Sequence, residues 1–330
     1  LPHLVTDATV EALARQYLWL GLPSLILAAV HFPLRFIWEG LGRVRLTVLT
    51  SLIMFLVNIP LDVFLVLGIG PYDGLGGAGC GLATTVSLLL GVLFSIWLVR
   101  RDRHLKMLLA PGRIQGRQFR QLLAVGSPAA TALLLEVSLF MLLALLVAPM
   151  GVQPLSAHQI ALNVTSVLYV VPFSLALAVS IETGRLRAEA DAVQLRQFAL
   201  RMLSLAALTG AGLSVVTWLL HDRVPTLFTT DERIRSLAAS LLLYAVAYQV
   251  GDALQMTAAG ILRAFGRTRS VLAATLVAYW GIGLGGGSWL AWYQEWGVRG
   301  YWLALAVGLT TAGVVLTLYL SSSSFWRKNR

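Results

Sequence analysis

Charged residues are scarce in this chain, and so are the motifs of soluble enzymes. Only 12% of its 330 residues are charged, 58% are hydrophobic, and the mean hydropathy is +0.78. A soluble protein of this length needs more polar surface. The single cysteine, Cys80, excludes a disulfide framework and a cysteine-rich metal site, and the five histidines lack paired spacing for zinc. P-loop, G-x-S-x-G and H-E-x-x-H motifs are missing, so we expect neither an enzyme nor a resident cofactor.

Long apolar runs dominate what is present. A helix needs about 20 apolar residues to cross the hydrocarbon core of a bilayer, and only helices suit this many consecutive spans. Nine segments meet that length: 12–38, 45–68, 77–99, 121–149, 156–181, 197–220, 236–262, 269–292 and 299–320. The sequence therefore predicts an all-α polytopic membrane protein with about nine transmembrane helices.

The loops between these runs predict the orientation. Taking alternate loops as one side, 19 of the 25 Lys and Arg residues fall on that side and four on the other. The positive-inside rule makes the rich side, with the C-terminus, cytoplasmic. This scatter over short loops is unlike a phosphate-binding face, so we expect no nucleic-acid partner. Aromatic residues around the last outer loop predict an interfacial belt, made of Trp289, Trp292, Tyr293, Trp296, Tyr301 and Trp302.

An internal repeat divides the chain. The run at 39–53 aligns with 263–277 at an offset of 224, and the run at 76–83 aligns with 297–304 at an offset of 221. Order and side of the membrane are preserved in both, which predicts two parallel-repeat bundles. We expect residues 1–118 to be the second half of an N-lobe, with three helices and a basic cytoplasmic linker at about 100–120. Residues 119–330 would be a complete six-helix C-lobe, and the parent protein would have 6 + 6 helices.

Two carboxylates lie in the middle of apolar spans. Glu136 is central in 121–149, and Asp252 lies within 236–262. A charge at the bilayer centre costs at least about 2.5–3.5 kcal/mol on the insertion scale, so such residues usually face a cavity or a partner. Since no lysine or arginine lies between the ends of these two helices, the pair predicts a cation site.

Polar side chains form stripes on the same segments. Tyr248, Asp252 and Gln255 are spaced i, i+4, i+7, which places them on one helix face. A second stripe with this spacing is formed by Gln159, Asn163 and Ser166, and Pro172 follows it. The proline would kink the helix and free a carbonyl toward the interior.

These stripes predict one hydrated cavity inside the six-helix bundle. Polar residues that only hydrogen-bond neighbouring helices would show the same pattern. For the stripe of Gln159, Asn163 and Ser166, a cavity lining and such structural hydrogen bonds are about equally expected. Asp62, in VNIPLDVFLVLG, is a further candidate for the cavity, although it lies toward the outer half of its helix and could point to water.

Over almost its whole length from about residue 12, the chain resembles the multidrug and toxic compound extrusion (MATE) family. The resemblance is carried by VNIPLDVFLVLG with GLGGAGCGLAT, LLLEVSLFMLLALLVAPMG, AHQIALNVTSVLYVVPFSLALAVSI and YQVGDALQMTAAGILRAFGRTRS. It implies that Glu136, Tyr248 and Asp252 help to bind a coupling cation, Na⁺ or H⁺. One stretch, SIETGRLRAEAD at 180–191, departs from the small-residue and glycine pattern of the family.

The resemblance implies a bacterial inner-membrane antiporter that exports cationic, lipophilic drugs by alternating access and works as a monomer in the lipid bilayer. A lipid-linked oligosaccharide or lipid II flippase of related architecture is the alternative, although its pyrophosphate substrate would favour a cationic cavity. A membrane-embedded enzyme would need acidic or histidine clusters in a long interfacial loop, which the sequence lacks. A channel fits the two-bundle repeat and the buried carboxylates less well than a carrier.

Overall fold

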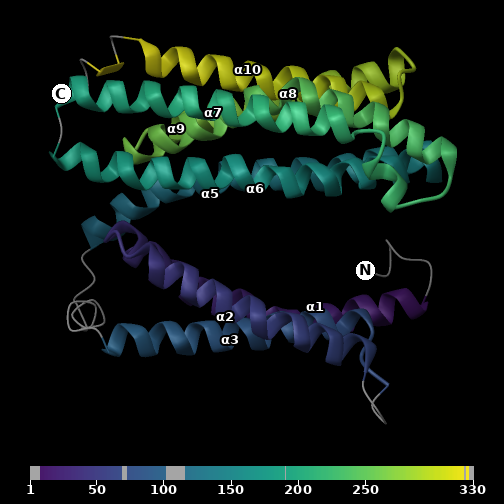
Figure 1. Ribbon diagram of the computed structural model, residues 1–330, viewed down its shortest axis with the longest axis horizontal. Coiled ribbons are helices and arrows are strands. Elements are labelled where there is room, and N and C mark those ends of the chain that lie inside the picture. The colour runs from purple at the N-terminus through teal and green to yellow at the C-terminus, as the bar shows by residue number, and fades with distance from the viewer. Residues whose placement is uncertain (1–7, 69–72, 102–115, 190, 323–324, 327–330) are drawn as a thin grey trace. The chain divides into compact units, whose positions relative to one another are not determined.

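The computed structural model describes residues 8–68, 73–101, 116–189, 191–322 and 325–326. Every regular element in these ranges is a helix, and nine helical segments are long and apolar enough to cross a membrane (Figure 1). The nine predicted spans and the all-helical class are therefore confirmed. The spans are Ala12–Gly40, Val44–Leu67, Gly77–Arg101, Gly116–Met150, Val152–Glu189, Ala192–Leu220, Glu232–Ala264, Thr268–Tyr293 and Val298–Ser321.

The chain forms two compact units, Leu1–Arg113 and Ile114–Arg330. The first unit holds α1 (Ala8–Gly40), α2 (Val44–Asp62) with a π-helical turn η1 (Val63–Leu67), and α3 (Gly77–Arg101). Most of the linker expected at about 100–120 lies outside the described residues. Its last part, from Gly116, is helical and opens the first helix of the second unit.

The second unit holds the remaining elements. They are α5 (Gly116–Val147), η3 (Ala148–Met150), α6 (Val152–Glu189), α7 (Ala192–Leu220), η4 (Val224–Leu227), α8 (Glu232–Ala264), α9 (Thr268–Thr275), η5 (Leu276–Gly286), η6 (Trp289–Tyr293) and α10 (Val298–Ser321). Because η5 and η6 are π-helical and continue α9, these three elements make up one span. The glycine-rich run GLGGGS lies across this irregular stretch.

Backbone conformation repeats between the units at the aligned positions. Gly42 and Gly266 have φ of 74° and 70°, and each lies two residues after the end of a helix and just before the arginine that is the N-cap of the next one. Gly76 and Gly297 both have φ of 56° before α3 and α10. Left-handed φ is cheap for glycine and costly for other residues, which explains why glycine recurs at both turns.

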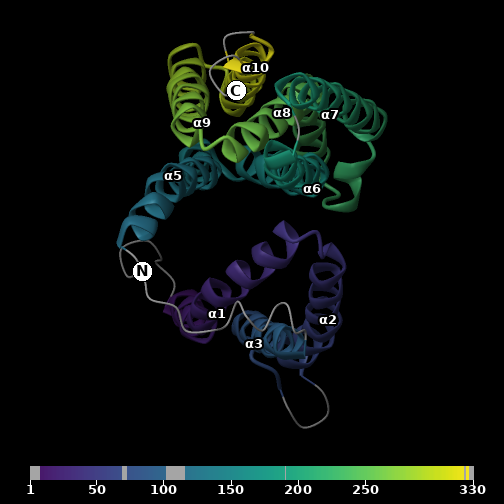
Figure 2. The same ribbon diagram turned by 90° about the vertical axis from the view of Figure 1, so that its left-hand side faces the viewer.

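Helix α8 lies at the centre of the second unit. It packs against α6, α7 and α10, and Figure 2 shows these helices around it nearly end-on. Glycines allow the close approach, since a Cβ on Gly251 would lie 2.6 Å from Thr310 Cα, and one on Gly260 would lie 2.6 Å from the Ala176 carbonyl. In a membrane, where hydrophobic burial does not drive helices together, such small residues permit the close van der Waals contacts that do.

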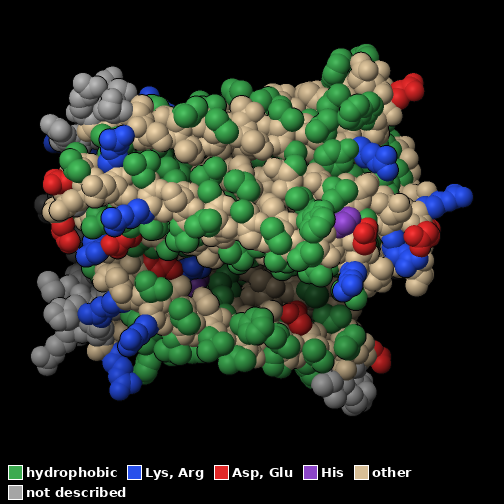
Figure 3. All heavy atoms as spheres, turned by 45° about the horizontal axis from the view of Figure 1, so that its top comes forward, with side chains coloured by type: hydrophobic (Ala, Val, Ile, Leu, Met, Phe, Trp, Pro, Cys, Tyr) green, Lys and Arg blue, Asp and Glu red, His purple; other side chains and the backbone are tan. Residues whose placement is uncertain are grey.

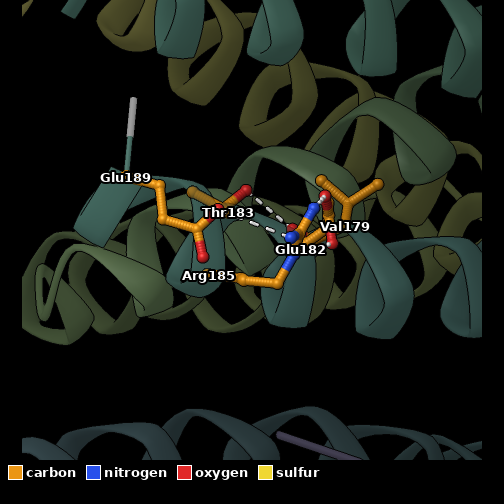
Figure 4. Close-up of polar contacts among 5 residues, drawn as sticks. All are labelled: Val179, Glu182, Thr183, Arg185 and Glu189. Carbon is orange, nitrogen blue, oxygen red and sulfur yellow. Dashed lines mark hydrogen bonds and ion pairs between the residues drawn. The ribbon is translucent and has the colours of Figure 1, made fainter. Parts of the chain in front are cut away.

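The stretch at 180–191 continues α6 as a regular helix to Glu189. Arg185 donates to Glu182 at 2.6 Å and to Glu189 at 3.5 Å, and the Thr183 hydroxyl donates to the Val179 carbonyl at 2.6 Å (Figure 4). Pairs of opposite charge spaced i, i+3 and i, i+4 stabilise an exposed helix. This explains locally how a sequence that lacks the expected small residues remains helical beyond the predicted end of the span at 181.

The side chains on the surface follow the pattern of a membrane protein. Hydrophobic side chains cover the middle of the helices, and charged ones lie mainly toward their ends (Figure 3). The aromatic belt needs one correction. Trp289, Trp292 and Trp296 are at least half exposed, whereas Tyr301 and Trp302 are buried in the core. Trp302 donates its indole N–H to His158 Nδ1 at 3.2 Å, which is an interaction inside the unit rather than at an interface.

Candidate functional site: a carboxylate-lined cavity in the second unit

A cavity of about 560 Å³ lies among α5, α6 and α8, with α7, η5 and α10 completing its wall. Its lining is mostly aromatic and aliphatic, with a small set of polar groups. The lining residues are Glu136, Val137, Phe140, Met141, Ala144, Gln159, Leu162, Thr165, Ser166, Leu168, Tyr169, Pro172, Leu213, Tyr248, Gln249, Asp252, Tyr279 and Leu309. A few convergent polar groups in an apolar cleft are typical of a small-molecule site.

Both mid-span carboxylates face this cavity. Glu136 reaches it from α5, and Asp252 reaches it from α8, where only 8% of the residue is exposed. The two are close enough to interact electrostatically. Two like charges in a largely apolar surrounding are unfavourable unless a cation or a proton offsets them.

Tyr169 of α6 holds one of these carboxylates in place. Its hydroxyl donates to Glu136 Oε1 at 3.2 Å and so joins α6 to α5 across the cavity. The ring stacks on Phe173 one helical turn further on, with centroids 5.6 Å apart, which orients the hydroxyl. Neither predicted stripe contained Tyr169. Its spacing of i+3 from Ser166 was the available signal.

Helix α8 contributes the second polar wall. Tyr248 and Asp252 line the cavity one turn apart, as the stripe predicted. Gln255, the third member, lies beside the cavity and not in its lining, where it accepts a hydrogen bond of 3.1 Å from the lining residue Tyr279. Gln249, which the stripe omitted, lines the cavity and donates to Thr217 of α7 at 2.9 Å.

The stripe on α6 is only partly placed as expected. Gln159 and Ser166 line the cavity, whereas Asn163 is exposed and is not among the lining residues. At about 100° per residue, Asn163 lies next to Gln159 and Ser166 at the edge of the helix face that forms the wall. Asp62 ends α2 in the first unit and does not line this cavity.

Pro172 lies within α6 and lines the cavity. Proline has no N–H, so the carbonyl of Leu168, four residues earlier, lacks its usual helical donor. Leu168 also lines the cavity, so the residue whose carbonyl is freed belongs to its wall. The kink stays a prediction from the sequence.

The donor set is made of oxygen atoms. Two carboxylates, the hydroxyls of Tyr169, Tyr248 and Thr165, and a backbone carbonyl are the ligands that a hard cation prefers. Over the described part of the chain, no cluster of three or more His, Cys, Asp or Glu residues could hold a metal ion. The arrangement can therefore exchange protons at its two carboxylates or bind an alkali cation with help from neutral oxygens.

Replacing Tyr169 by phenylalanine should weaken Na⁺ binding at the cavity about tenfold or more, because Y169F removes a hydroxyl oxygen and the hydrogen bond that orients Glu136 while keeping the ring. A hydrogen bond to a charged group contributes about 1.5–3 kcal/mol. Calorimetric titration of the purified protein with Na⁺ measures the loss, and titration with acid should show a change of the opposite sign, because the hydrogen bond from Tyr169 favours the ionised carboxylate. Tyr244→Phe, on α8 outside the lining, is the matched control, and equal affinities for Y169F and the unaltered protein would contradict the assignment.

Fold and site together define a polytopic helical membrane protein with a carboxylate-lined binding cavity inside a six-helix unit. The chain belongs to the multidrug and toxic compound extrusion family. The MatE family profile matches residues 128–287. The chain is 34% identical over 305 residues to the "Probable multidrug resistance protein NorM" of Acinetobacter baylyi, covering 91% of this chain and 67% of that protein.

A second relative agrees with this assignment, and two solved structures share the fold. "Multidrug resistance protein MdtK" of Edwardsiella ictaluri is 32% identical over 292 residues, covering 86% of this chain and 64% of its own length. The eukaryotic MATE transporter AtDTX14 superposes with a TM-score of 0.87 at 22% identity, over 98% of this chain and 72% of the other. An outward-facing multidrug resistance MATE family transporter gives 0.88 at 20% identity, over 99% and 73%. These structures show the fold.

Proposed function

We propose that this chain belongs to an efflux carrier that exports cationic, lipophilic compounds in exchange for Na⁺ or H⁺. The observation that carries the proposal is the cavity with Glu136 on α5 and Asp252 on α8 facing one largely apolar space. The aromatic and aliphatic wall suits a lipophilic body, and the carboxylates suit a positive charge. The relatives named as multidrug resistance proteins support the same reading.

The exchange of ion for drug would follow because both are cations and compete for the same negatively charged carboxylates. Glu136, Asp252 and Tyr248 would bind the coupling cation, and a cationic drug would be released outward as the ion takes its place. Exchange requires only that ion and drug stabilise different conformations. The conformational change would move the two lobes about the pseudo-two-fold axis and open the cavity to either side in turn.

The carrier would be a monomer in the bacterial inner membrane with its C-terminus in the cytoplasm. The distribution of arginines over the loops supports this orientation. Since the chain spans 67% and 64% of the two relatives' lengths, the transport cycle is proposed for the full gene product.

Ethidium efflux from cells that express the full gene product tests the proposal. Sodium is either present or replaced by choline, with membrane potential and pH gradient held constant. We expect efflux that needs one of the two ions. Loss of efflux without sodium assigns the site to Na⁺, whereas efflux that follows the pH gradient assigns it to H⁺. Absence of efflux under every condition would refute the exporter and favour a flippase.

A further inference from the structure

A second cavity shares no lining residue with the first. It has a volume of about 470 Å³ and runs between the span made by α9 with η5 and helix α10. Its lining is Ser270, Ala273, Ala274, Val277, Ala278, Thr311, Ala312, Val315, Leu316 and Tyr319. Val277 is 61% exposed and Val315 is 51% exposed, so the groove opens onto the surface that faces lipid.

Small side chains make this groove deep. Four of its lining residues are alanines, three on the α9–η5 span and one on α10. The same spacing of i, i+3, i+4 and i+7 in Ser270, Ala273, Ala274 and Val277 places one face of the α9 span along it. A long, narrow, apolar groove of this volume is within the range of ligand clefts, about 300–1,000 Å³. Its shape suits one extended hydrocarbon chain.

One end of the groove is polar and basic. Ser270 lies in the first turn of α9, and Tyr319 lies in the last turn of α10, so both hydroxyls belong to the same end. Arg269 is exposed and stands four residues before Ala273, on the groove's face of α9. Helical side chains lean toward the N-terminus, which directs Arg269 toward the end of the groove where a lipid headgroup would lie.

A neighbouring groove offers an internal comparison. It lies between α8 and α10, has a volume of about 450 Å³, and is lined by Ala247, Leu303, Ala306, Val307, Thr310, Thr311, Val314 and Val315. Its described lining consists of aliphatic, alanine and threonine side chains. It resembles the first groove in size but has no lining tyrosine, and its nearby arginine, Arg299, stands four residues before Leu303 at the opposite end of α10 from Tyr319. The two grooves therefore differ at the end where a lipid headgroup would lie.

We propose that the groove between α9–η5 and α10 is a binding site for an anionic phospholipid. One acyl chain lies along the alanines, and the phosphate is bound by the Arg269 guanidinium with the hydroxyls of Ser270 and Tyr319. A guanidinium matches a phosphate in charge and in geometry. This end of the protein is the arginine-rich one, and anionic lipids attract basic residues next to a membrane. The site is separate from the transport cavity, and its test does not depend on transport.

The experiment is native mass spectrometry of the full chain, stripped of lipid and then titrated with phosphatidylglycerol or phosphatidylcholine that carry the same acyl chains. We expect phosphatidylglycerol to bind about fivefold more tightly, as one basic residue beside an anionic headgroup provides. Arg269→Gln should remove this preference, because phosphatidylglycerol loses the attraction of its net negative charge to the guanidinium, whereas phosphatidylcholine, whose phosphate is offset by its own choline, loses less. Ala273→Phe, which fills the groove from its exposed side, should weaken both lipids.

Two matched control variants test whether the effect is specific to this groove or common to the whole lipid-facing surface. Arg201→Gln removes an exposed arginine on α7, and Val307→Phe fills the neighbouring groove. Neither should change the preference for phosphatidylglycerol. Equal affinity for the two lipids in the unaltered protein would overturn the proposal. So would a loss in R201Q as large as that in R269Q, or an A273F variant that binds phosphatidylglycerol normally, provided that each variant melts at the temperature of the parent.

Discussion

Asp252→Asn should abolish ion-driven efflux and lower the affinity for the coupling cation by at least about tenfold. Losing one partner of a buried charge pair costs about 2–5 kcal/mol, which is at least about tenfold in affinity, and the amide lacks the charge that the cation or proton must meet. Asp252 is 8% exposed at the wall of the cavity, so water cannot replace it readily. Ethidium efflux in cells and calorimetric cation titration of the purified variant measure the two losses.

The same substitution should leave the empty protein as stable as before, or more so. A buried charge without a partner is costly, and asparagine has nearly the same volume as aspartate without that charge. Thermal melting in cation-free buffer checks this and excludes misfolding as the cause of lost transport. Asp222→Asn is the matched control because its side chain is 77% exposed and lies outside the transport cavity. Normal ion-driven efflux by D252N would show that the coupling site lies elsewhere.

Gly313→Val should destabilise the second unit by about 1–3 kcal/mol or more and sharply reduce the folded protein recovered from membranes. A Cβ on Gly313 of α10 would collide with the backbone of Gly251 on α8, which cannot move aside as a flexible side chain could. Gly251 precedes Asp252, so separating the two helices also displaces the cavity wall.

Gly212→Val provides the control for this prediction. Gly212 lies within α7, and nothing lies within 4 Å of a Cβ built there, so the variant carries the same β-branched cost in a helix without the collision. The midpoint of thermal unfolding in detergent compares the two. If G313V melts at the temperature of G212V, the close contact between α8 and α10 does not hold the unit together.

The elements were predictable because the signal for a membrane span is local. Each of the nine spans consists of about 20 or more apolar residues, and each predicted segment overlaps one observed span. The two carboxylates were recognisable for a related reason, since a charge in an apolar run is costly wherever the helix lies. The turn glycines, such as Gly42 and Gly266, were visible through the repeat and have left-handed φ as glycine allows.

The sequence predicted less well which side of each helix faces the cavity, the core or the lipid, and the differences between prediction and structure are of this kind. Asn163 belonged to a polar stripe and yet is exposed outside the cavity, while Tyr169 on the same helix binds Glu136. Tyr301 and Trp302 looked like interfacial residues and are buried in the core. In a soluble helix, polar residues would mark the outer face. In a membrane helix, lipid and core are both apolar, so composition does not distinguish the two sides.

The sequence by itself determined the membrane class, the nine spans, the repeat, the family resemblance and the two carboxylates, because each depends on residues close together along the chain. Only the tertiary structure decided which side chains share the cavity. Glycine contacts on α8 decide how closely α6, α7 and α10 approach it, and the packing of α6 against α5 brings Tyr169 to Glu136. The alanine groove beside Arg269 likewise exists only once α9–η5 lies against α10. Such contacts depend on the shapes of two helix surfaces at once, which one segment of sequence does not specify.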